Sequence, residues 1–440
     1  MSPLSSRRTF AASHRHRHVP PRLSLRARFG IAQSSSRPWQ AFGPGLVSGA
    51  SANDPTTVAS LAVVGATTVY GLAWLVVLLL PMLALIQTIA ASVGAVSQMS
   101  LQQAIARTYG RGAAIVALAA VVVIGLLTLG ADIKAGAEAL TLLSGLPLYY
   151  FVLPLVVVVG WLLATNSYLK IERILAFFTL VFLCYVASAI CARPDWGEVL
   201  RSILIPRFNL SPVFVTGAVA LLGTTLTSYE YFWESIEVAE RRPALAQLRA
   251  VKADAALGML VAGSSFLFIL IASAATSGKH QVPVRTALDA AVALKPLAGS
   301  WAQILFGVGL LASATIAIPI IAATNGYVIA QTFGLRASLR LKVNDAKAFY
   351  RVIFASLAIG AVFALLPIPT IALLYWVSVA AGIATPVTLA LCVLVARNPE
   401  AMGGRPIGVR LASAGWAVTA IVTVASIGFF LTAARSLFHG

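Results

Sequence analysis

Charged side chains are scarce in this chain of 440 residues: they make up 10% of it, and only 14 residues are acidic. Hydrophobic residues make up 59%, and the mean hydropathy is +0.89. This balance excludes an ordinary soluble domain, and the long uncharged stretches are typical of a membrane protein with many spanning helices. Membrane β-strands would alternate in polarity, which these stretches do not. The predicted fold class is therefore all-α and polytopic.

Cysteine and histidine are also rare. The three cysteines, Cys184, Cys191 and Cys392, lie in apolar segments without CxxC spacing, so they indicate neither a disulfide framework nor a zinc site. None of the five histidines falls inside a predicted span. The spans also lack a nucleophile–base pair and a catalytic metal motif. The sequence thus predicts a protein that is not an enzyme and uses no cofactor.

The apolar stretches divide into about eleven spans, at roughly 20 apolar residues per crossing. Their expected limits are 42–68, 70–95, 113–143, 149–168, 171–192, 212–240, 255–277, 301–333, 351–367, 370–396 and 409–435. Residues 1–40 are rich in Arg, Ser and Pro, and we expect a disordered basic cytoplasmic tail there. Residues 41–440 are expected to form one transmembrane domain.

Basic residues gather in alternate loops. The formal net charge is +18, and the loops on one side of the predicted membrane carry most of it, for example at Arg107, Arg241 and Lys342. The positive-inside rule then predicts a cytoplasmic N-terminus. Because the basic residues are explained by orientation in a lipid bilayer, we do not expect nucleic acid as a partner.

The first apolar stretch is interrupted by Asp54-Pro55-Thr56-Thr57, about a dozen residues or roughly 15 Å into the bilayer. An acid at that depth is costly and marks a functional site by default. Pro55 removes a backbone donor, and a carboxylate beside freed carbonyls and a hydroxyl forms an oxygen-rich site suited to a cation. The alternative is a structural kink in which Asp54 pairs with a neighbouring donor.

A second interruption, from Gly223 to Ser228, lies at a similar depth in the sixth stretch. It contains four hydroxyl residues, which offer the backbone alternative partners. Two broken helices five spans apart predict inverted repeats with a binding site at the midplane. We place the repeats at 42–205 and 211–397, with an extra helix at 409–435. A Thr-rich packing seam between helices would explain the second interruption equally well on its own.

The run Gly43-Pro44-Gly45 with Asp54-Pro55 resembles the first helix of the NRAMP family of divalent-metal transporters, whose motif there is Asp-Pro-Gly-Asn. The run from Gly223 to Tyr229, followed by Phe232-Trp233, looks like the sixth helix of a divergent bacterial branch. The resemblance covers residues 41–435. It implies a LeuT-type fold of two inverted five-helix repeats plus an extra helix, in a bacterial inner membrane. It also implies a metal ion held between helices one and six.

The chain departs from the family pattern at the ligand positions. The asparagine of the first helix is Thr57 here, and the sixth-helix motif Ala-x-x-Met-Pro-His becomes Thr224, Thr227, Ser228 and Tyr229. Losing the thioether leaves an all-oxygen site, which among Mn²⁺, Mg²⁺ and Fe²⁺ favours the harder Mg²⁺ or Mn²⁺. The predicted metal ligands are Asp54, Thr57, Thr224 and Thr227.

Other acids suggest a route for protons or ions. The family's acidic pair on helix three appears as Asp132 and Ala135, which weakens the case for proton coupling. An ion pair of Asp132 with an internal Arg or Lys is the alternative. Glu230, Glu234 and Glu237 share one helix face, either as an acidic wall for cations or as a solvated helix end paired with arginines. The predicted pathway residues are Asp132, Tyr229, Glu230 and Glu234.

The sequence therefore predicts a secondary transporter that moves divalent metal cations by alternating access, as a monomer. The first alternative is a transporter of amino acids or other small organic solutes with the same fold, although Asp54 would repel a substrate carboxylate. A membrane sensor or scaffold that binds metal without transporting it is the second alternative.

Overall fold

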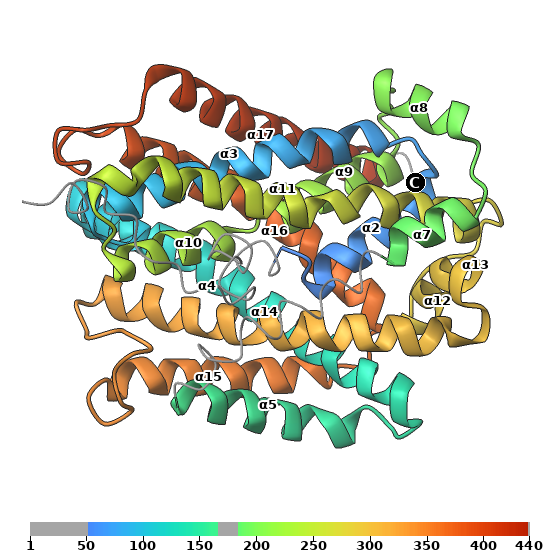
Figure 1. Cartoon of the computed structure of the whole chain (residues 1–440), viewed down its shortest axis with the longest axis horizontal. Coiled ribbons are helices and arrows are strands. Elements are labelled where there is room, and N and C mark those ends of the chain that lie inside the picture. Colours follow the sequence, from blue (N-terminus) through green and yellow to red (C-terminus); the bar gives the residue numbers. More distant parts are fainter. Residues whose placement is uncertain (1–51, 166–183, 439–440) are drawn as a thin grey trace, which may run out of the picture. The chain divides into compact units, whose positions relative to one another are not determined.

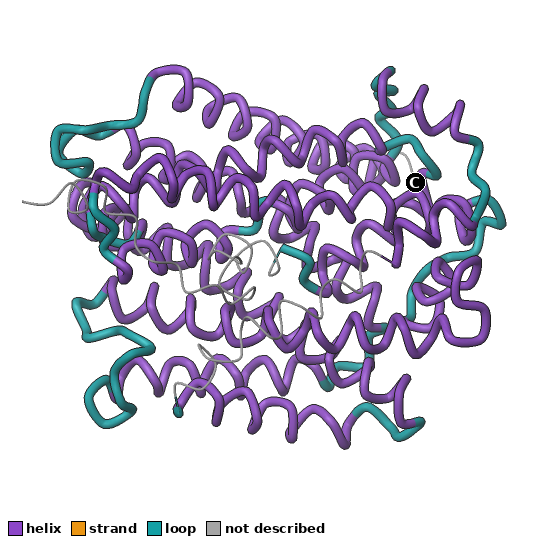
Figure 2. Tube along the Cα trace, in the orientation of Figure 1, coloured by secondary structure: helices purple, strands orange, loops and turns teal. Residues whose placement is uncertain are grey.

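The computed structural model describes residues 52–165 and 184–438, and every regular element in these ranges is a helix (Figure 2). The main helices are α2 (Pro55–Thr68), α3 (Ala73–Ser97), α4 (Leu101–Ser144), α5 (Tyr149–Ala164), α9 (Pro212–Thr225), α10 (Ser228–Arg241), α11 (Leu248–Ser273), α14 (Ala302–Thr332), α15 (Lys347–Ala364), α16 (Thr370–Arg397) and α17 (Val409–Phe438). Shorter helices are α7 (Cys184–Cys191), α8 (Trp196–Leu204), α12 (Ala287–Ala291) and α13 (Lys295–Ala298). The all-α prediction is confirmed.

Within the described ranges, eight helical segments are long and apolar enough to cross a membrane. They are Ala73–Ser97, Leu101–Ser144, Pro212–Arg241, Leu245–Gly278, Ala287–Thr332, Lys347–Ala364, Thr370–Arg397 and Val409–Arg435. The apolar helix α5 is shorter, with 16 residues. The expected tail at 1–40, the start of the first span at 42–51 and the residues 171–183 of the fifth span lie outside the described residues.

Helix α4 begins well before the predicted start of the third span at residue 113. It starts at Leu101, behind a capping box in which Ser100 and Gln103 bond to each other's backbone N–H groups. Gly110 interrupts it with φ 80° and ψ −178°, a backbone conformation that glycine adopts readily. Hydropathy marks only the apolar part of such a helix, so the polar turns before the kink were missed.

Helices α4 and α14 lie antiparallel along one another (Figure 1). Near one end of the pair Gly125 lies beside the Asn325 side chain, and near the other Gly307 lies beside Leu143. Helix α15 packs on the same pair, against Gly130 and Ile133 of α4. This packing places Asp132 of α4 in the interior of the protein, with no exposed surface.

The sixth span is divided into α9 and α10, which Figure 1 shows one after the other along the molecule. Only Leu226 and Thr227 separate them. Just before the break, α9 touches α16 so closely that a Cβ on Gly223 would lie 2.1 Å from the Ser378 carbonyl oxygen. Only glycine fits there, so the backbone contact fixes the end of α9 against α16. The predicted interruption at 223–228 is confirmed.

Candidate metal site between the broken helices

Asp54 is the N-cap of α2, with Pro55 in the first helical position. Its backbone is extended, at φ −66° and ψ 163°, and its Oδ1 accepts a 2.7 Å hydrogen bond from the Thr57 backbone N–H. Asp is among the strongest N-cap residues, and proline at N1 suits the start of a helix. The sequence Asp-Pro thus starts a helix here, and the side chain is 1% exposed.

The second carboxylate oxygen of Asp54 has two hydroxyl donors. The Thr56 hydroxyl donates to Oδ2 at 2.7 Å, and the Tyr229 phenol on α10 donates to the same oxygen at 2.8 Å. All of these donors are neutral. In the described ranges the ion pairs are Arg241–Glu237 and Arg340–Glu240, so Asp54 has no basic partner there. The neighbouring donors that the structural alternative requires are therefore present, but no basic side chain in the described ranges neutralises the carboxylate, so a site for a cation remains open.

Three threonine hydroxyls connect α2 to the end of α9. Thr224 donates to Thr56 at 3.2 Å, and the hydroxyls of Thr57 and Thr224 lie 3.0 Å apart. Since the Thr224 hydroxyl has a single proton and donates it to Thr56, the geometry fits Thr57 as the donor of the other bond. The chain of donors runs from Thr57 through Thr224 and Thr56 to Asp54. The structure therefore brings together three of the four predicted ligands: Asp54, Thr57 and Thr224.

The fourth predicted ligand, Thr227, is the N-cap of α10 but does not cap it with its side chain. Its hydroxyl donates instead to the carbonyl oxygens of Gly223 and Thr224, both at 2.8 Å. It therefore closes the end of α9, and its remaining oxygen lone pairs can still accept or coordinate. Among the described residues no group of three or more His, Cys, Asp or Glu side chains could hold a metal ion. A cation at this site would meet carboxylate, hydroxyl and carbonyl oxygens.

Two residues at the site were not predicted as parts of it. Thr56 joins Asp54 to Thr224, as described above. Asn53 fixes the turn before α2: its amide donates to the Ala262 carbonyl at 3.2 Å, and its Oδ1 accepts from Ser265 at 2.8 Å. The Asn53 carbonyl also accepts from Ser313 of α14. An asparagine directly before Asp-Pro was the available signal, but its distant partners cannot be found from sequence alone.

Two further carboxylates lie within electrostatic reach of Asp54, namely Asp132 on α4 and Glu230 on α10. They are 0% and 4% exposed, and none of their carboxylate oxygens has a hydrogen-bond partner in the described ranges. The neighbouring Lys134 does not pair with Asp132, since its ammonium donates to the Leu366 carbonyl at 2.5 Å. The expected ion pair of Asp132 with a lysine is therefore not found among the described residues.

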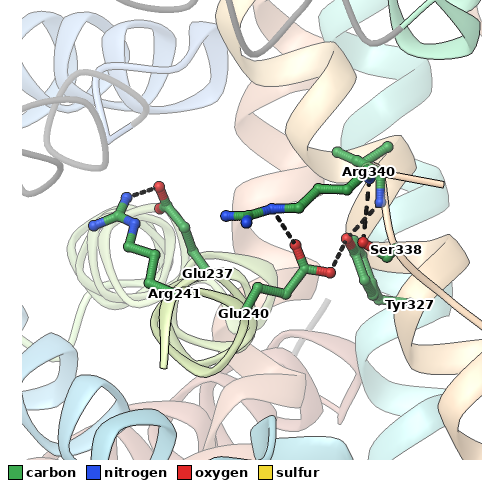
Figure 3. Close-up of polar contacts among 7 residues, drawn as sticks. Glu237, Glu240, Arg241, Tyr327, Ser338 and Arg340 are labelled. Atoms are coloured by element: carbon green, nitrogen blue, oxygen red, sulfur yellow. Dashed lines mark hydrogen bonds and ion pairs between the residues drawn. The ribbon is translucent and has the colours of Figure 1, made fainter. Parts of the chain in front are cut away.

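The far end of α10 carries its acids differently (Figure 3). Glu237 forms an ion pair with Arg241, and Glu240 accepts a 2.7 Å hydrogen bond from the Tyr327 phenol of α14. Glu240 also lies 3.8 Å from Arg340. The acidic-wall interpretation is therefore wrong for Glu237, which follows the alternative of a paired helix end. Glu234, one turn closer to the break, is 5% exposed.

In the described residues the sixth span is interrupted between α9 and α10, beside the buried carboxylate at the start of α2, as in secondary transporters with discontinuous helices. Comparison with solved structures identifies the architecture as LeuT-type. Among the solved structures that share this fold is the manganese transporter of Eremococcus coleocola, with a TM-score of 0.72 and 20% sequence identity; the match covers 90% of this chain and 87% of that one. Another is the nucleobase-cation-symport-1 family transporter Mhp1, with a TM-score of 0.54 and 15% identity; the match covers 88% of this chain and 90% of that one. The family model described as "Natural resistance-associated macrophage protein-like" matches residues 45–432. The chain belongs to the Nramp family.

Curated relatives agree with this assignment. The divalent metal cation transporter MntH of Mycobacterium tuberculosis is 29% identical over 289 residues, which cover 62% of this chain and 66% of the relative. MntH of Deinococcus radiodurans is 28% identical over 285 residues, covering 62% and 64%. The matched part thus spans slightly less than two thirds of each relative, and both relatives are named as transporters rather than as enzymes.

Proposed function

We propose that this chain is a secondary transporter of divalent metal cations, with the ion bound at Asp54. The observation that carries the proposal is that this buried carboxylate is held only by neutral donors, where α2 meets the break between α9 and α10. A cation can therefore approach it without first displacing a basic side chain. The names of the curated relatives and of the Eremococcus coleocola structure support the substrate class.

The proposed ligands are the carboxylate of Asp54, the hydroxyls of Thr57 and Thr224, and an oxygen of Thr227. The proton chain from Thr57 to Asp54 supports this set, because each hydroxyl directs its proton along the chain and keeps lone pairs free. Oxygen-only sites suit hard cations, so we propose Mn²⁺ or Mg²⁺ as the preferred ions, with Fe²⁺ as a softer competitor.

Alternating access would follow from the two interruptions. The ligands come from the start of α2, the end of α9 and the residue before α10, so movement of one half-helix changes the ion's surroundings. We propose that the site opens to one side and then to the other as these half-helices move. Asp132, Tyr229, Glu230 and Glu234 are proposed to line the route of protons or ions. Ala135, where the family has a second acid, argues against strict proton coupling.

The proposed setting is a bacterial inner membrane, with a cytoplasmic N-terminus and a monomeric carrier. Hydrogen bonds connect the α3–α4 loop and the start of α4 to the middle of α10 and to the end of α14: Leu101 N–H donates to Ser235, and Ser100 donates to Gln331. Arg107, Arg241 and Arg340 follow these segments closely in sequence. Basic residues that follow connected segments support one basic end of the protein, and by the positive-inside rule they support the proposed cytoplasmic N-terminus.

The test is uptake into proteoliposomes that contain the full chain. We expect Mn²⁺ and Mg²⁺ to accumulate well above protein-free vesicles, and Asp54→Ala to reduce uptake to that background. Asp345→Ala is the matched control, because Asp345 lies in an exposed loop and should leave uptake near wild type. Undiminished flux in Asp54→Ala would reject the site. Absence of Mn²⁺, Mg²⁺ and Fe²⁺ flux in the wild type would reject the substrate class.

A further inference from the structure

Glu230 occupies a position at which a glutamate usually caps its helix. It is the third residue of α10, where a glutamate can accept from the N-cap backbone N–H and complete a capping box. Here the N-cap side chain, Thr227, is bonded back to α9, and neither carboxylate oxygen of Glu230 has a hydrogen-bond partner in the described ranges. Local helix capping therefore does not explain this residue.

The burial of Glu230 makes its lack of partners more significant. Its side chain is 4% exposed, and burying a carboxylate without donors is strongly unfavourable unless a positive charge or a proton accompanies it. Glu237 and Glu240, further along the same helix, show the ordinary solution, because each lies near an arginine. Glu230 lies instead in the first turn of α10, directly after Tyr229, whose phenol donates to Asp54.

The helix ends at the break partly cancel the negative charge of Asp54. The positive ends of α2 and α10 and the negative end of α9 meet there, and each end counts as about half an elementary charge, so together they contribute about +0.5. Asp54 alone would bring the site to about −0.5, which suits a monovalent cation better than a divalent one. Counting only the charges on α2, α9 and α10, and leaving out Asp132 on α4, Glu230 brings the break to about −1.5, close to the charge that balances a divalent ion.

We propose that Glu230 supplies the second full negative charge of the cation site and so favours divalent over monovalent cations. In this proposal Glu230 acts through space or through a bound water, while Asp54 contacts the ion. The inference rests on the proposed function, because it assumes that a cation binds at Asp54. It assigns Glu230 a role in selecting the substrate's charge.

The experiment measures Mn²⁺ and Mg²⁺ binding to the purified full chain by titration calorimetry at constant ionic strength. We expect Glu230→Gln to raise the Mn²⁺ Kd at least tenfold, while Glu230→Asp, which keeps the charge, stays within about threefold of wild type. Glu237→Gln is the matched control on the same helix, and its Kd should change less than twofold. Equal Mn²⁺ affinity in Glu230→Gln and wild type would overturn the inference.

The melting temperature without metal separates this role from a structural one. Removing an unpartnered buried charge should leave it unchanged or raise it, whereas the increase produced by Mn²⁺ should shrink. A lower metal-free melting temperature that Glu230→Asp does not restore would assign Glu230 to folding instead. If the wild type binds Mn²⁺ normally and Glu230→Gln does too, only this inference fails. If the wild type binds neither ion, the proposed function fails first and the inference with it.

Discussion

The phenol of Tyr229 lies 2.8 Å from Oδ2 of Asp54, so a residue of the sixth span holds the carboxylate of the first. This bond joins α10 directly to the start of α2. In the family pattern a histidine stands at this position, and the tyrosine keeps a hydrogen-bond donor there without the capacity to carry a positive charge near neutral pH. The tyrosine therefore connects the two spans without placing a basic group beside Asp54.

Removing the phenol hydroxyl of Tyr229 should lower the stability of the metal-free protein. Tyr229→Phe deletes one buried hydrogen bond to a charged group, a change of about 1.5–3 kcal/mol in the free energy of unfolding. We expect a melting temperature several degrees lower without metal and a Mn²⁺-induced increase that is at least as large as in wild type. Thermal unfolding in detergent measures both. Tyr150→Phe, at an exposed position, is the control, and an unchanged melting temperature in Tyr229→Phe would contradict the expectation.

The threonine chain should matter through its hydroxyls rather than its shape. Thr57→Val and Thr224→Val keep the branched outline but remove one oxygen each, and we expect each to lower Mn²⁺ uptake by about tenfold, the effect of losing about 1.4 kcal/mol of binding. Because the two hydroxyls share one hydrogen bond, the double variant should lose less than the sum of the single losses. Thr225→Val is the control, since that hydroxyl donates within α9 to Leu221. Additive losses would argue against a shared site.

The contact between α9 and α16 should not tolerate even one methyl group. A Cβ at Gly223 would also lie 2.2 Å from the Gly382 backbone nitrogen, and backbone cannot move aside as a side chain can. We expect Gly223→Ala to cost at least about 1–3 kcal/mol, seen as a lower melting temperature and reduced yield of monodisperse protein. Gly112→Ala, with nothing within 4 Å of the added Cβ, is the matched control. Equal stability of the two variants would show that this contact is looser than described.

The polar cluster in Figure 3 should stabilise the fold without contributing to ion affinity. The Tyr327 hydroxyl donates to Glu240 and accepts from the Leu339 backbone N–H at 2.8 Å. Tyr327→Phe leaves both groups short of a partner, so we expect a loss of about 1–3 kcal/mol in stability. The Mn²⁺ Kd from calorimetry should remain within twofold of wild type. A large change in Kd would mean that this end of α10 communicates with Asp54.

Much of the architecture could be predicted because hydropathy reports burial in lipid directly. The break at 223–228 was visible as a polar run within an apolar one, and Asp54 stood out because acids are rare at that depth. The early start of α4 was not visible, since Ser100, Gln103 and Gly110 are governed by capping and backbone conformation rather than by hydropathy. Hydropathy therefore predicted the positions of the membrane spans better than the residues at which the helices begin and end.

Most residues of the candidate site were predicted from the sequence, but the hydrogen bonds that connect them were not. Asp54, Thr57 and Thr224 were named in advance, whereas the roles of Tyr229 as a donor to Asp54 and of Asn53 as an anchor depend on residues more than 170 positions away. Helical spacing placed Glu230 and Glu237 on one face, but spacing alone could not show that Arg241 pairs with the second. Tertiary packing gives Glu237 a basic partner and gives Glu230 no hydrogen-bond partner among the described residues, although the two acids look alike in the sequence.

The two halves of the sixth span have different neighbours. α9 is fixed to α16 through Gly223 and Gly382, while the Ser235 hydroxyl in the middle of α10 accepts from the Leu101 backbone N–H at the start of α4. Relative displacement of these neighbours must therefore be absorbed by the torsion angles of Leu226 and Thr227. Since Thr224 and Thr227 flank that joint, any such displacement changes the spacing of their oxygens. If Mn²⁺ binds at the proposed site, its coordination number would therefore be a spectroscopic reporter of the conformation of the protein.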